Sequence, residues 1–315
     1  MNVFKLGDAI AHDEATTLTV GTYDGVHVGH RHIIDAMKAT AQQHGERTVV
    51  VTFDPHPQIV LAKADKAPVR TLTTLDQKLE ILEQCGVDAT VIIPFTTDFA
   101  ATSPQDFVRD VIVGSIGVRH FFVGHDHMFG KDRGGDLSTL IELGTSHGFD
   151  VTKIGPVHVD DAIVSSTRIR RALHDGHVED AAVLLARPYQ VRGIVVRGDQ
   201  RGRKLGIPTA NIAPDSVHTL LPAHGVYVVS SVIDGRTVYG MANIGLRPTF
   251  TNDTESTLEV HFLDYDSMLY DRTLSVDFHR FIRKEQRFEH ADMFLSQLRE
   301  DRMVAAEFAE QQQRT

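Results

Sequence analysis

The sequence of 315 residues predicts an α/β unit built on a parallel sheet, followed by a small antiparallel β-barrel with a closing helix. Three observations carry this prediction. Short β-branched runs alternate with amphipathic stretches in the first half, Pro188 ends the last helical pattern there, and strand-length runs separated by Gly, Pro and Asn follow. Strand–helix alternation is typical of a parallel sheet with helices on both faces, and short strands at regular spacing are typical of a barrel.

The strands of the parallel sheet are expected at five β-branched runs, namely Leu18–Val20, Thr48–Phe53, Ala89–Ile93, His120–Val123 and Val151–Ile154. The amphipathic stretches between them are expected to form helices at His30–His44, Leu75–Cys85, Pro104–Val113 and Leu137–His147. Ligands of such sheets bind outside the carboxyl ends of the strands. Two polar loops, residues 21–30 and 124–130, directly follow predicted strands, so we expect a binding site at this edge.

The second half begins where Arg187-Pro188-Tyr189 ends a helical pattern over His177–Ala186. At roughly 100–200 residues per domain, two domains are favoured. We therefore divide the chain into residues 1–186 and 187–315. The barrel strands are expected at Tyr189–Arg197, Gly225–Ile233, Thr237–Asn243, Thr257–Leu263 and Thr273–Phe281, and the closing helix at Ala291–Glu310.

The chain carries 32 basic and 42 acidic residues, a net charge of −10 with histidine neutral. This balance argues against a protein that holds nucleic acid by bulk charge attraction and leaves the binding of a small anion open. The single cysteine, Cys85, excludes an intramolecular disulfide and a multi-cysteine metal site, and it fits a reducing compartment, so we expect a cytoplasmic location. We expect no membrane partner, because no segment approaches the roughly 20 apolar residues that span a bilayer.

The loop GTYDGVHVGH, residues 21–30, leads from a predicted strand into a predicted helix. A glycine-rich turn at a helix N-terminus offers free N–H groups and the positive end of the helix dipole, which together favour a phosphate. His27 and His30 are three residues apart and project to the same side, and Gly29 lets phosphates approach the backbone. The alternatives are a turn with two solvent-facing histidines and a metal site at His27 and His30.

Three further polar segments are expected at the same edge of the sheet. They are TFDPHP at residues 52–57, VGHDHMFG at 123–130 and SSTRIR at 165–170. Hydroxyl groups at a helix start cap the helix, and arginines bind phosphate. A plain N-cap is the alternative for the last segment.

These four motifs, in this order, resemble the FAD synthetase module of bacterial bifunctional riboflavin kinase/FAD synthetases, and H-x-G-H at residues 27–30 resembles the nucleotidylyltransferase signature. The resemblance implies a Rossmann-like nucleotidylyltransferase fold that transfers an adenylyl group from ATP to FMN without a covalent enzyme intermediate. It places His27 and His30 at the ATP phosphates and the transition state. The other implied ATP-binding residues are Gly21, Tyr23, Asp24, Gly29, His56, Asp126, Ser166, Thr167 and Arg170.

The chain departs from this pattern at two aromatic positions. Tyr23 stands where phenylalanine is usual, and His127 also stands where phenylalanine is common. The change at His127 places a titratable ring beside the expected nucleotide loop.

The second domain opens with the basic, glycine-rich segment GDQRGRKLGIPTANI at residues 198–212. Such a loop can close over polyphosphate. A solvated loop and an RNA-binding loop are the alternatives, and RNA is disfavoured because the loop has no aromatic ring on which bases stack. Thr209 and Asn211 offer hard oxygen donors of the kind that Mg²⁺ accepts, although the segment alone also describes a simple turn. Glu259, on the polar face of its strand, is either a solvated residue or a general base.

The barrel resembles the riboflavin kinase domain of the same bifunctional proteins. The matching segments are residues 198–212, HGVYVV at 224–229, NIGLRPTF at 243–250, LEVHFLDYDSMLYDR at 258–272 and FIRKEQRF at 281–288. The resemblance implies phosphorylation of the riboflavin 5′-hydroxyl by ATP, with Thr209 and Asn211 at Mg²⁺ and Glu259 as the base. The other implied ATP- and flavin-binding residues are Gly202, Arg203, Gly206, Pro208, Asn243, Arg247 and Arg283. Asp271 stands where the family usually has glycine.

Both halves together predict a bifunctional enzyme that makes FMN from riboflavin and FAD from FMN, with riboflavin, FMN and ATP as partners and Mg²⁺ as cofactor. One alternative is an enzyme with kinase activity only. A second is a flavin-binding regulator or RNA-associated protein that lost the chemistry, and a lesser third is a metalloenzyme that uses the histidines. No sequence feature specifies an oligomeric state.

Overall fold

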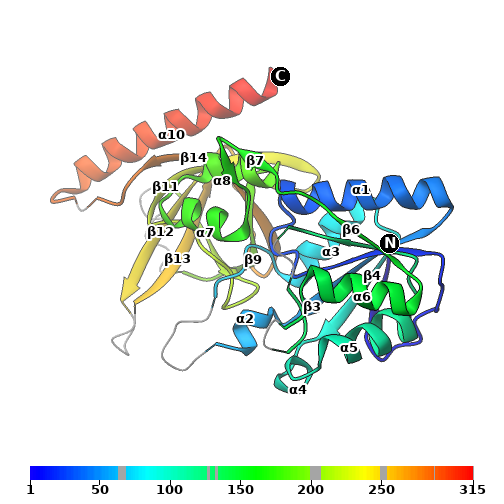
Figure 1. The fold of residues 1–315 in the computed structure, drawn as a ribbon. Coiled ribbons are helices and arrows are strands. Elements are labelled where there is room, and N and C mark those ends of the chain that lie inside the picture. The colour runs from blue at the N-terminus through cyan, green and yellow to red at the C-terminus, as the bar shows by residue number, and fades with distance from the viewer. Residues whose placement is uncertain are drawn as a thin grey trace. The chain divides into compact units, whose positions relative to one another are not determined.

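The computed structural model describes residues 1–62, 69–125, 128–131, 134–198, 207–248, 254–286 and 288–314. The chain forms two compact units, Met1–Ser166 and Thr167–Thr315, each of which is described by itself (Figure 1). Five of the residues singled out by sequence lie outside the described residues, namely Asp126, His127, Gly202, Arg203 and Gly206, and so does the side chain of Arg247.

The first unit contains a six-stranded parallel sheet in the order β1-β4-β3-β2-β5-β6. Its strands are β1 Asn2–Lys5, β2 Thr16–Val20, β3 Arg47–Asp54, β4 Ala89–Pro94, β5 His120–Val123 and β6 Asp150–Lys153. The five predicted strands are confirmed, and β1 is an additional edge strand whose short, mostly exposed sequence carries little pattern. Because β2 pairs with β3 on one side and with β5 on the other, the order in which strands are added to the sheet reverses there. Ligands of open α/β sheets bind at such a switch point.

Helices cover both faces of this sheet. On one face, α1 Val28–His44 and α3 Leu75–Gln84 pack Ile34, Met37 and Leu82 against the strands. On the other face, the wide-turned helix η1 Phe107–Ile116 and α6 Leu137–His147 bury Ile112 and Leu140. The short elements of this unit are α2 Pro57–Val60, α4 Thr97–Ala100, α5 Pro104–Asp106, β7 His158–Val159 and β8 Ala162–Ile163. The helix predicted over Pro104–Val113 is therefore split, with a single α-helical turn leading into η1.

The second unit is a closed antiparallel barrel in the order β10-β13-β12-β11-β14-β9, which confirms the predicted architecture. Its strands are β9 Tyr189–Val196, β10 Ala210–Pro214, β11 Gly225–Ile233, β12 Arg236–Pro248, β13 Thr254–Phe262 and β14 Thr273–Arg283. The helices are α7 Ser166–His174, α8 Val178–Leu185 and α10 Ala291–Gln313, which packs on β11 and β12 as the closing helix. The strand β10 was missed, because its first residues look like part of a turn.

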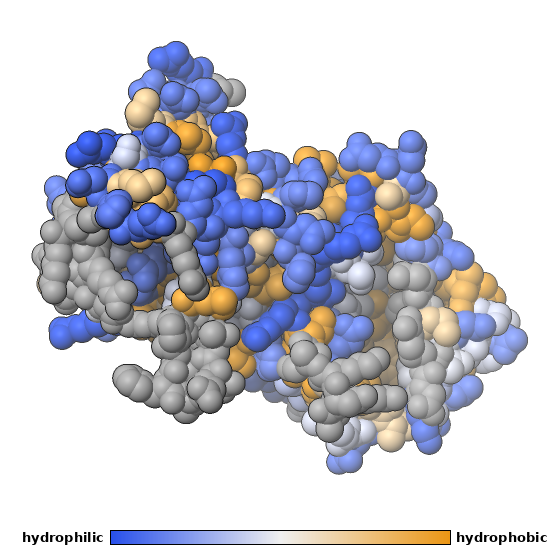
Figure 2. Space-filling model, turned by 90° about the vertical axis from the view of Figure 1, so that its left-hand side faces the viewer, coloured by the Kyte–Doolittle hydropathy of each residue, from blue (hydrophilic) through white to orange (hydrophobic). Residues whose placement is uncertain are grey.

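The chain divides into its two compact units between Ser166 and Thr167, which is earlier in the sequence than the boundary predicted between residues 186 and 187. The helix α8 accounts for part of this difference, since it packs on β14 and β9 of the barrel. The domain boundary itself stays a prediction. None of the helices in the described part of the chain is both long and apolar enough to cross a membrane. Among the described residues on the face shown in Figure 2, hydrophilic residues outnumber hydrophobic ones, which lie between them in small groups.

Candidate active sites

The loop between β2 and α1 lies at the switch point of the parallel sheet and has an unusual backbone. Tyr23, Gly25 and Val26 have φ angles of 48°, 83° and 39°. Positive φ is free for glycine and strained for a β-branched residue such as Val26, whose side chain is fully buried. Strain of this kind persists only where the surroundings hold the backbone in place, and it gathers at functional sites.

Hydrogen bonds anchor this loop to the sheet beneath it. The hydroxyl groups of Thr19 and Tyr23 lie 2.7 Å apart, and the N–H of Gly21 donates to the carbonyl of Val51 at 3.0 Å. Burial raises the pKa of Tyr23, so its hydroxyl stays protonated. Tyrosine at this position therefore adds a tie to β2 that phenylalanine cannot make.

His27 and His30 form a stacked pair at the start of α1. Their ring centroids lie 3.7 Å apart with an angle of 15° between the planes. His27 caps the helix, and its Nδ1 accepts a hydrogen bond from the backbone N–H of His30 at 3.3 Å. Because Nδ1 is the acceptor, a neutral His27 carries its proton on Nε2 and can donate from there.

The second ring of the pair is held uncharged. Burial, and then the nearby charges of His27 and Lys78, lower the pKa of His30 well below its ordinary value. Nδ1 of His30 is buried without a hydrogen-bond partner in the described part of the chain. At neutral pH the pair therefore offers polar groups, not two positive charges, to a ligand.

Gly29 is required by the position of His27. A Cβ atom at residue 29 would lie 3.1 Å from Cε1 and 3.2 Å from Nδ1 of the His27 ring. Any side chain there has to displace the imidazole. Gly29, which was predicted to let phosphates approach the backbone, thus also leaves room for the ring of His27.

Two other predicted segments differ in their relation to this loop: Ser166 contacts it, whereas His56 forms a capping hydrogen bond within its own helix. Ser166 Oγ donates to the carbonyl of Asp24 at 2.9 Å, so the segment 165–170 contacts the loop of residues 21–30. The carboxylate of Asp24 accepts from Leu72 and Thr73 N–H groups at 2.9 and 3.2 Å, so this oxygen supports the loop. His56 caps α2, where its Nδ1 accepts from the N–H of Gln58 at 3.1 Å.

Thr167 and Arg170 fall in the other compact unit. Both lie in the first two turns of α7, three residues apart and so on one side of the helix. Thr167 is exposed and Arg170 is half-buried. Their proposed contact with pyrophosphate stays a prediction.

Sequence reasoning missed Lys78 of α3. Its side chain is buried, and its Nζ donates to Thr52 Oγ1 at 3.2 Å. The signal was present, since Lys78, Ile81 and Leu82 follow the three- and four-residue spacing of the buried face of this helix. A lysine in an apolar stripe is rare and needs a reason.

Three half-buried phenylalanines lie at or just after the carboxyl ends of β3 and β4. Sequence reasoning included Phe53 in the segment 52–57 but missed Phe95 and Phe99. The ring of Phe53 lies 5.6 Å from Phe95 and 6.4 Å from Phe99. The Phe53–Phe95 contact is edge-to-face and the Phe53–Phe99 contact is tilted, and such contacts hold aromatic rings in defined orientations. They provide an aromatic surface at the same edge of the sheet as the histidine loop.

In the barrel, strand register brings together residues from three strands. Asn211 of β10 pairs with Glu259 of β13, and Glu259 in turn pairs with Asn243 of β12. Residues directly opposite in an antiparallel sheet share one face. All three side chains are half-buried, while their neighbours Leu258 and Val260 fill the core. The structure therefore places three predicted residues in one row outside the barrel core.

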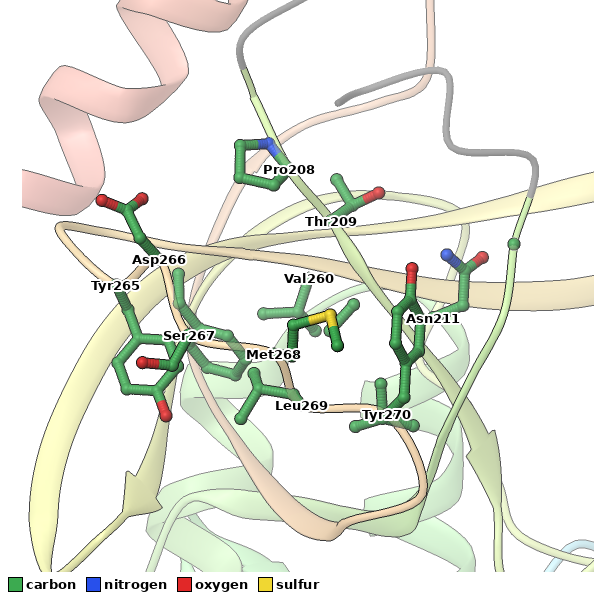
Figure 3. A pocket seen from close by; sticks show the side chains of 14 residues that line it. Pro208, Thr209, Asn211, Val260, Tyr265, Asp266, Ser267, Met268, Leu269 and Tyr270 are labelled. Carbon is green, nitrogen blue, oxygen red and sulfur yellow. The ribbon is translucent and has the colours of Figure 1, made fainter. Parts of the chain in front are cut away.

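Thr209 completes this polar group, because its Oγ1 lies 3.4 Å from Glu259 Oε2. A pocket of about 290 Å³ opens beside it and is lined on one side by Pro208, Thr209 and Asn211 (Figure 3). The segment Tyr265–Tyr270 provides further walls, among them the side chains of Met268 and Leu269. Sequence reasoning named this stretch only as part of the family-like segment at residues 258–272 and gave it no role in a pocket.

Arg283 and Asp271 have structural roles in the barrel. Arg283 donates to both carboxylate oxygens of Asp301 on α10, with the closest contact at 2.7 Å, and Asp301 is 1% exposed. This pair fastens the closing helix to β14. Asp271 has a φ of 64°, a left-handed conformation that glycine adopts without strain.

The oxygen donors of the barrel fit a hard cation. No group of three or more His, Cys, Asp or Glu side chains placed to hold a metal occurs among the described residues. The hydroxyl of Thr209 and the amide of Asn211 nevertheless offer oxygen donors of the kind that holds Mg²⁺ together with phosphate and water, beside the carboxylate of Glu259.

Comparison with known proteins assigns a family to each half. The FAD synthetase family model matches residues 9–168 and the riboflavin kinase family model matches residues 185–309. The chain is 37% identical to the bifunctional riboflavin kinase/FMN adenylyltransferase of Listeria monocytogenes over 305 residues, 96% of each chain. It is 38% identical to the enzyme of that name from Escherichia coli, over 95% of this chain and 94% of that one.

A relative and a solved structure extend the likeness. The Bacillus subtilis bifunctional riboflavin kinase/FMN adenylyltransferase is 34% identical over 93% of this chain and 92% of its own length. A crystal structure described as a macrolide-efflux protein from Streptococcus pneumoniae superposes with a TM-score of 0.88 at 29% identity. That match covers 97% of this chain and 99% of the other, so the two chains share both units of the fold.

Proposed function

The chain belongs to the family of bifunctional riboflavin kinase/FMN adenylyltransferases, and from this we propose which residues carry each of its two reactions. It phosphorylates riboflavin to FMN with ATP, and it then transfers the adenylyl group of a second ATP to FMN, giving FAD and pyrophosphate. The barrel performs the first reaction and the parallel-sheet unit the second. The assignment of individual residues is our proposal.

In the barrel, Glu259 is the general base. Its carboxylate takes the proton of the riboflavin 5′-hydroxyl while that oxygen forms a bond to the γ-phosphorus of ATP, and the bond from this phosphorus to the β-bridging oxygen breaks to release ADP. The strand register that sets Glu259 between Asn211 and Asn243 is the observation that carries this assignment. Thr209 and Asn211 would hold Mg²⁺, which neutralises phosphate charge when bound.

The pocket beside Thr209 takes the adenosine of ATP in this proposal. Its apolar wall at Met268 and Leu269 suits a purine ring, and its polar side at Thr209 and Asn211 faces the phosphates. The glycine-rich segment 199–206, outside the described residues, is proposed to cover those phosphates.

In the parallel-sheet unit, the FMN phosphate attacks the α-phosphorus of ATP. The new bond joins the two phosphates, and the bond to the β-phosphate breaks so that pyrophosphate leaves with its electron pair. His27 donates from Nε2 to a phosphate oxygen at the switch point, and His30 supports its ring by stacking. Such catalysis depends on positioning and charge stabilisation.

The remaining predicted residues complete this site as proposals. Ser166, Thr167 and Arg170 bind the leaving pyrophosphate, and Asp126 binds the nucleotide. Phe53, Phe95 and Phe99 offer aromatic surface for the flavin ring of FMN. Cys85, the single cysteine, and ATP as co-substrate support a cytoplasmic location.

One assay tests the division of labour. The purified chain is incubated with riboflavin, ATP and Mg²⁺, and the flavins are separated over time. FMN rises first and then gives way to FAD. Glu259→Gln is expected to abolish FMN formation and keep FAD formation from added FMN, and His27→Ala is expected to do the reverse. If either variant affects the other reaction equally, the assignment to units is wrong.

A further inference from the structure

The first turn of α3 and the segment before it hold the histidine loop on one side. Asp24 accepts hydrogen bonds from the N–H groups of Leu72 and Thr73, and the N–H of Gly25 donates to Thr73 Oγ1 at 3.2 Å. Thr74 then caps the helix in a reciprocal pair with Gln77. The position of the loop is therefore coupled to the start of α3.

Lys78 of the same helix turn reaches the loop through Thr52 of β3. Its backbone N–H bonds to Thr74, and its side chain is only 6% exposed. Nζ donates to Thr52 Oγ1 at 3.2 Å and lies 3.5 Å from the carbonyl oxygen of Phe53. Thr52 Oγ1 in turn donates to the carbonyl of Thr22 at 3.1 Å, so a chain of hydrogen bonds joins α3, β3 and the loop.

The charges around this lysine connect it to the histidine pair. Burial lowers the pKa of Lys78, while the carboxylates of Asp24 and Asp54 oppose that change and favour the charged form. The positive charge of Lys78 contributes to the lowered pKa of His30. The ring of His30 also lies beside His27 and beside Tyr23, whose ring centroid is 4.8 Å from that of His30. Two charged imidazoles stacked 3.7 Å apart would repel each other.

We propose that Lys78 is a positioning residue for adenylyl transfer, which fixes the loop of residues 21–30 through Thr52 and so keeps the His27–His30 pair stacked. The proposal rests on the roles of His27 and His30 given above. Without the ammonium group, the loop loses its link to α3 through Thr52, and one of the smaller causes of the lowered pKa of His30 is removed. The pair is then held less firmly, and the donor on His27 moves away from its phosphate.

The test compares Lys78→Met with Lys38→Met. Lys38 is a matched control, because it is a half-buried lysine of the same unit whose Nζ donates to the carbonyl of Cys85 at 2.5 Å. In Lys78→Met, kcat for FAD formation is expected to fall about 10- to 100-fold, with KM for FMN nearly unchanged. FMN formation in the barrel is the internal control and stays the same, and Lys38→Met changes neither rate.

A second measurement separates positioning from general stability. Histidine Cε1–H NMR, with the His30 signal assigned from His30→Gln, is expected to show a higher pKa for His30 in Lys78→Met and no change in Lys38→Met. Thr52→Val keeps the cation and removes the relay, so it is expected to lower kcat without moving the His30 pKa, and it serves where Lys78→Met does not fold.

Three results would overturn the proposal. They are an unchanged kcat in folded Lys78→Met, an unchanged His30 pKa in that variant, and an unchanged kcat in Thr52→Val. Failure of the proposed function is recognised separately, because His27→Ala would then still form FAD, while the NMR comparison continues to report on Lys78.

Discussion

The two candidate sites are assembled in opposite ways. In the parallel-sheet unit, His27, Gly29 and His30 come from one loop, and their geometry depends on local backbone angles and a stacked ring pair. In the barrel, Asn211, Glu259 and Asn243 lie far apart in sequence and meet only because three strands pair in register. The first site is thus sensitive to local change, and the second depends on the integrity of the whole barrel.

This difference predicts that activity and stability separate in one unit and stay coupled in the other. A loop distorted by a small change can lose function while the sheet beneath it remains folded. A barrel strand that shifts its pairing loses hydrogen bonds and moves a catalytic side chain at the same time. Matched glycine substitutions, one in each unit, test this contrast.

The largest effect is expected from Gly29→Ala in the loop. The added Cβ would lie 3.1 Å from the His27 ring, which has to move away. The ring has to shift by a few tenths of an ångström. Since a misplacement of about 1 Å at a catalytic group can cost about 100-fold in rate, we expect FAD formation from added FMN to fall by about 10-fold or more. Thermal unfolding and FMN formation serve as controls and stay close to wild type. A normal rate of FAD formation would show that the loop adapts and that the site is less dependent on local geometry.

The second effect is expected from Gly240→Ala on β12. A Cβ there would lie 2.4 Å from the carbonyl oxygen of His261 and 3.1 Å from Cα of Phe262, both on the neighbouring strand β13. Backbone has to shift, at a cost of about 1–3 kcal/mol in the free energy of unfolding. Because β13 also carries Glu259, FMN formation is expected to fall together with stability, as measured by urea unfolding and flavin chromatography. Reduced stability with a normal rate would mean that the shift stays local.

The same contrast explains how far the sequence could predict each site. The loop residues form one short motif, so sequence reasoning found His27, Gly29 and His30 together. Glu259 was named from the alternation of its strand and Asn243 from family resemblance. Nothing local in the sequence states that they face Asn211, because strand register is a tertiary property. Lys78 was missed because only the apolar residues of α3 were used to predict its buried face.

The fold was predictable for similar reasons. Strands such as β5 and β11 and the helix α6 have strong patterns, and the predicted bounds agree with the structure. The strand β10 was not predicted, since Pro208 and Thr209 immediately before it look like a turn. Its strand character comes from pairing with β9 and β13 on both sides.

The next, smaller effect concerns the pH dependence of the free energy of unfolding, which is expected to differ between the two units. The pKa of His30 is lowered in the folded first unit, mainly by burial, and burial also lowers the pKa of His279 in the barrel. The unfolded chain takes up these protons below about pH 6.5 and the folded chain does not, so stability falls as pH drops. The slope is at most about 1.4 kcal/mol per pH unit for each histidine.

Single substitutions assign these slopes. His30→Gln should flatten the pH dependence of the free energy of unfolding below about pH 6.5, and His279→Gln should flatten it less, because Ser230 Oγ lies 2.8 Å from its Nε2 and gives the ring a polar partner. Urea unfolding at several pH values measures both. An equal reduction in the two variants would contradict the view that the loop site holds the more strongly perturbed histidine.

The smallest effect is expected at Asp271, where the barrel has a left-handed residue of its own. Asp271 is exposed with a φ of 64°, whereas Val26 of the histidine loop is buried with a φ of 39°. In Asp271→Gly the relief of backbone strain is offset by the greater freedom of glycine in the unfolded chain, so stability should change by less than about 0.5 kcal/mol. Asp271→Val should instead lose about 1–2 kcal/mol, because a β-branched residue resists this conformation. If both variants keep the wild-type rate of FMN formation, this turn is structural, and left-handed strain serves catalysis only where the surrounding loop is buried.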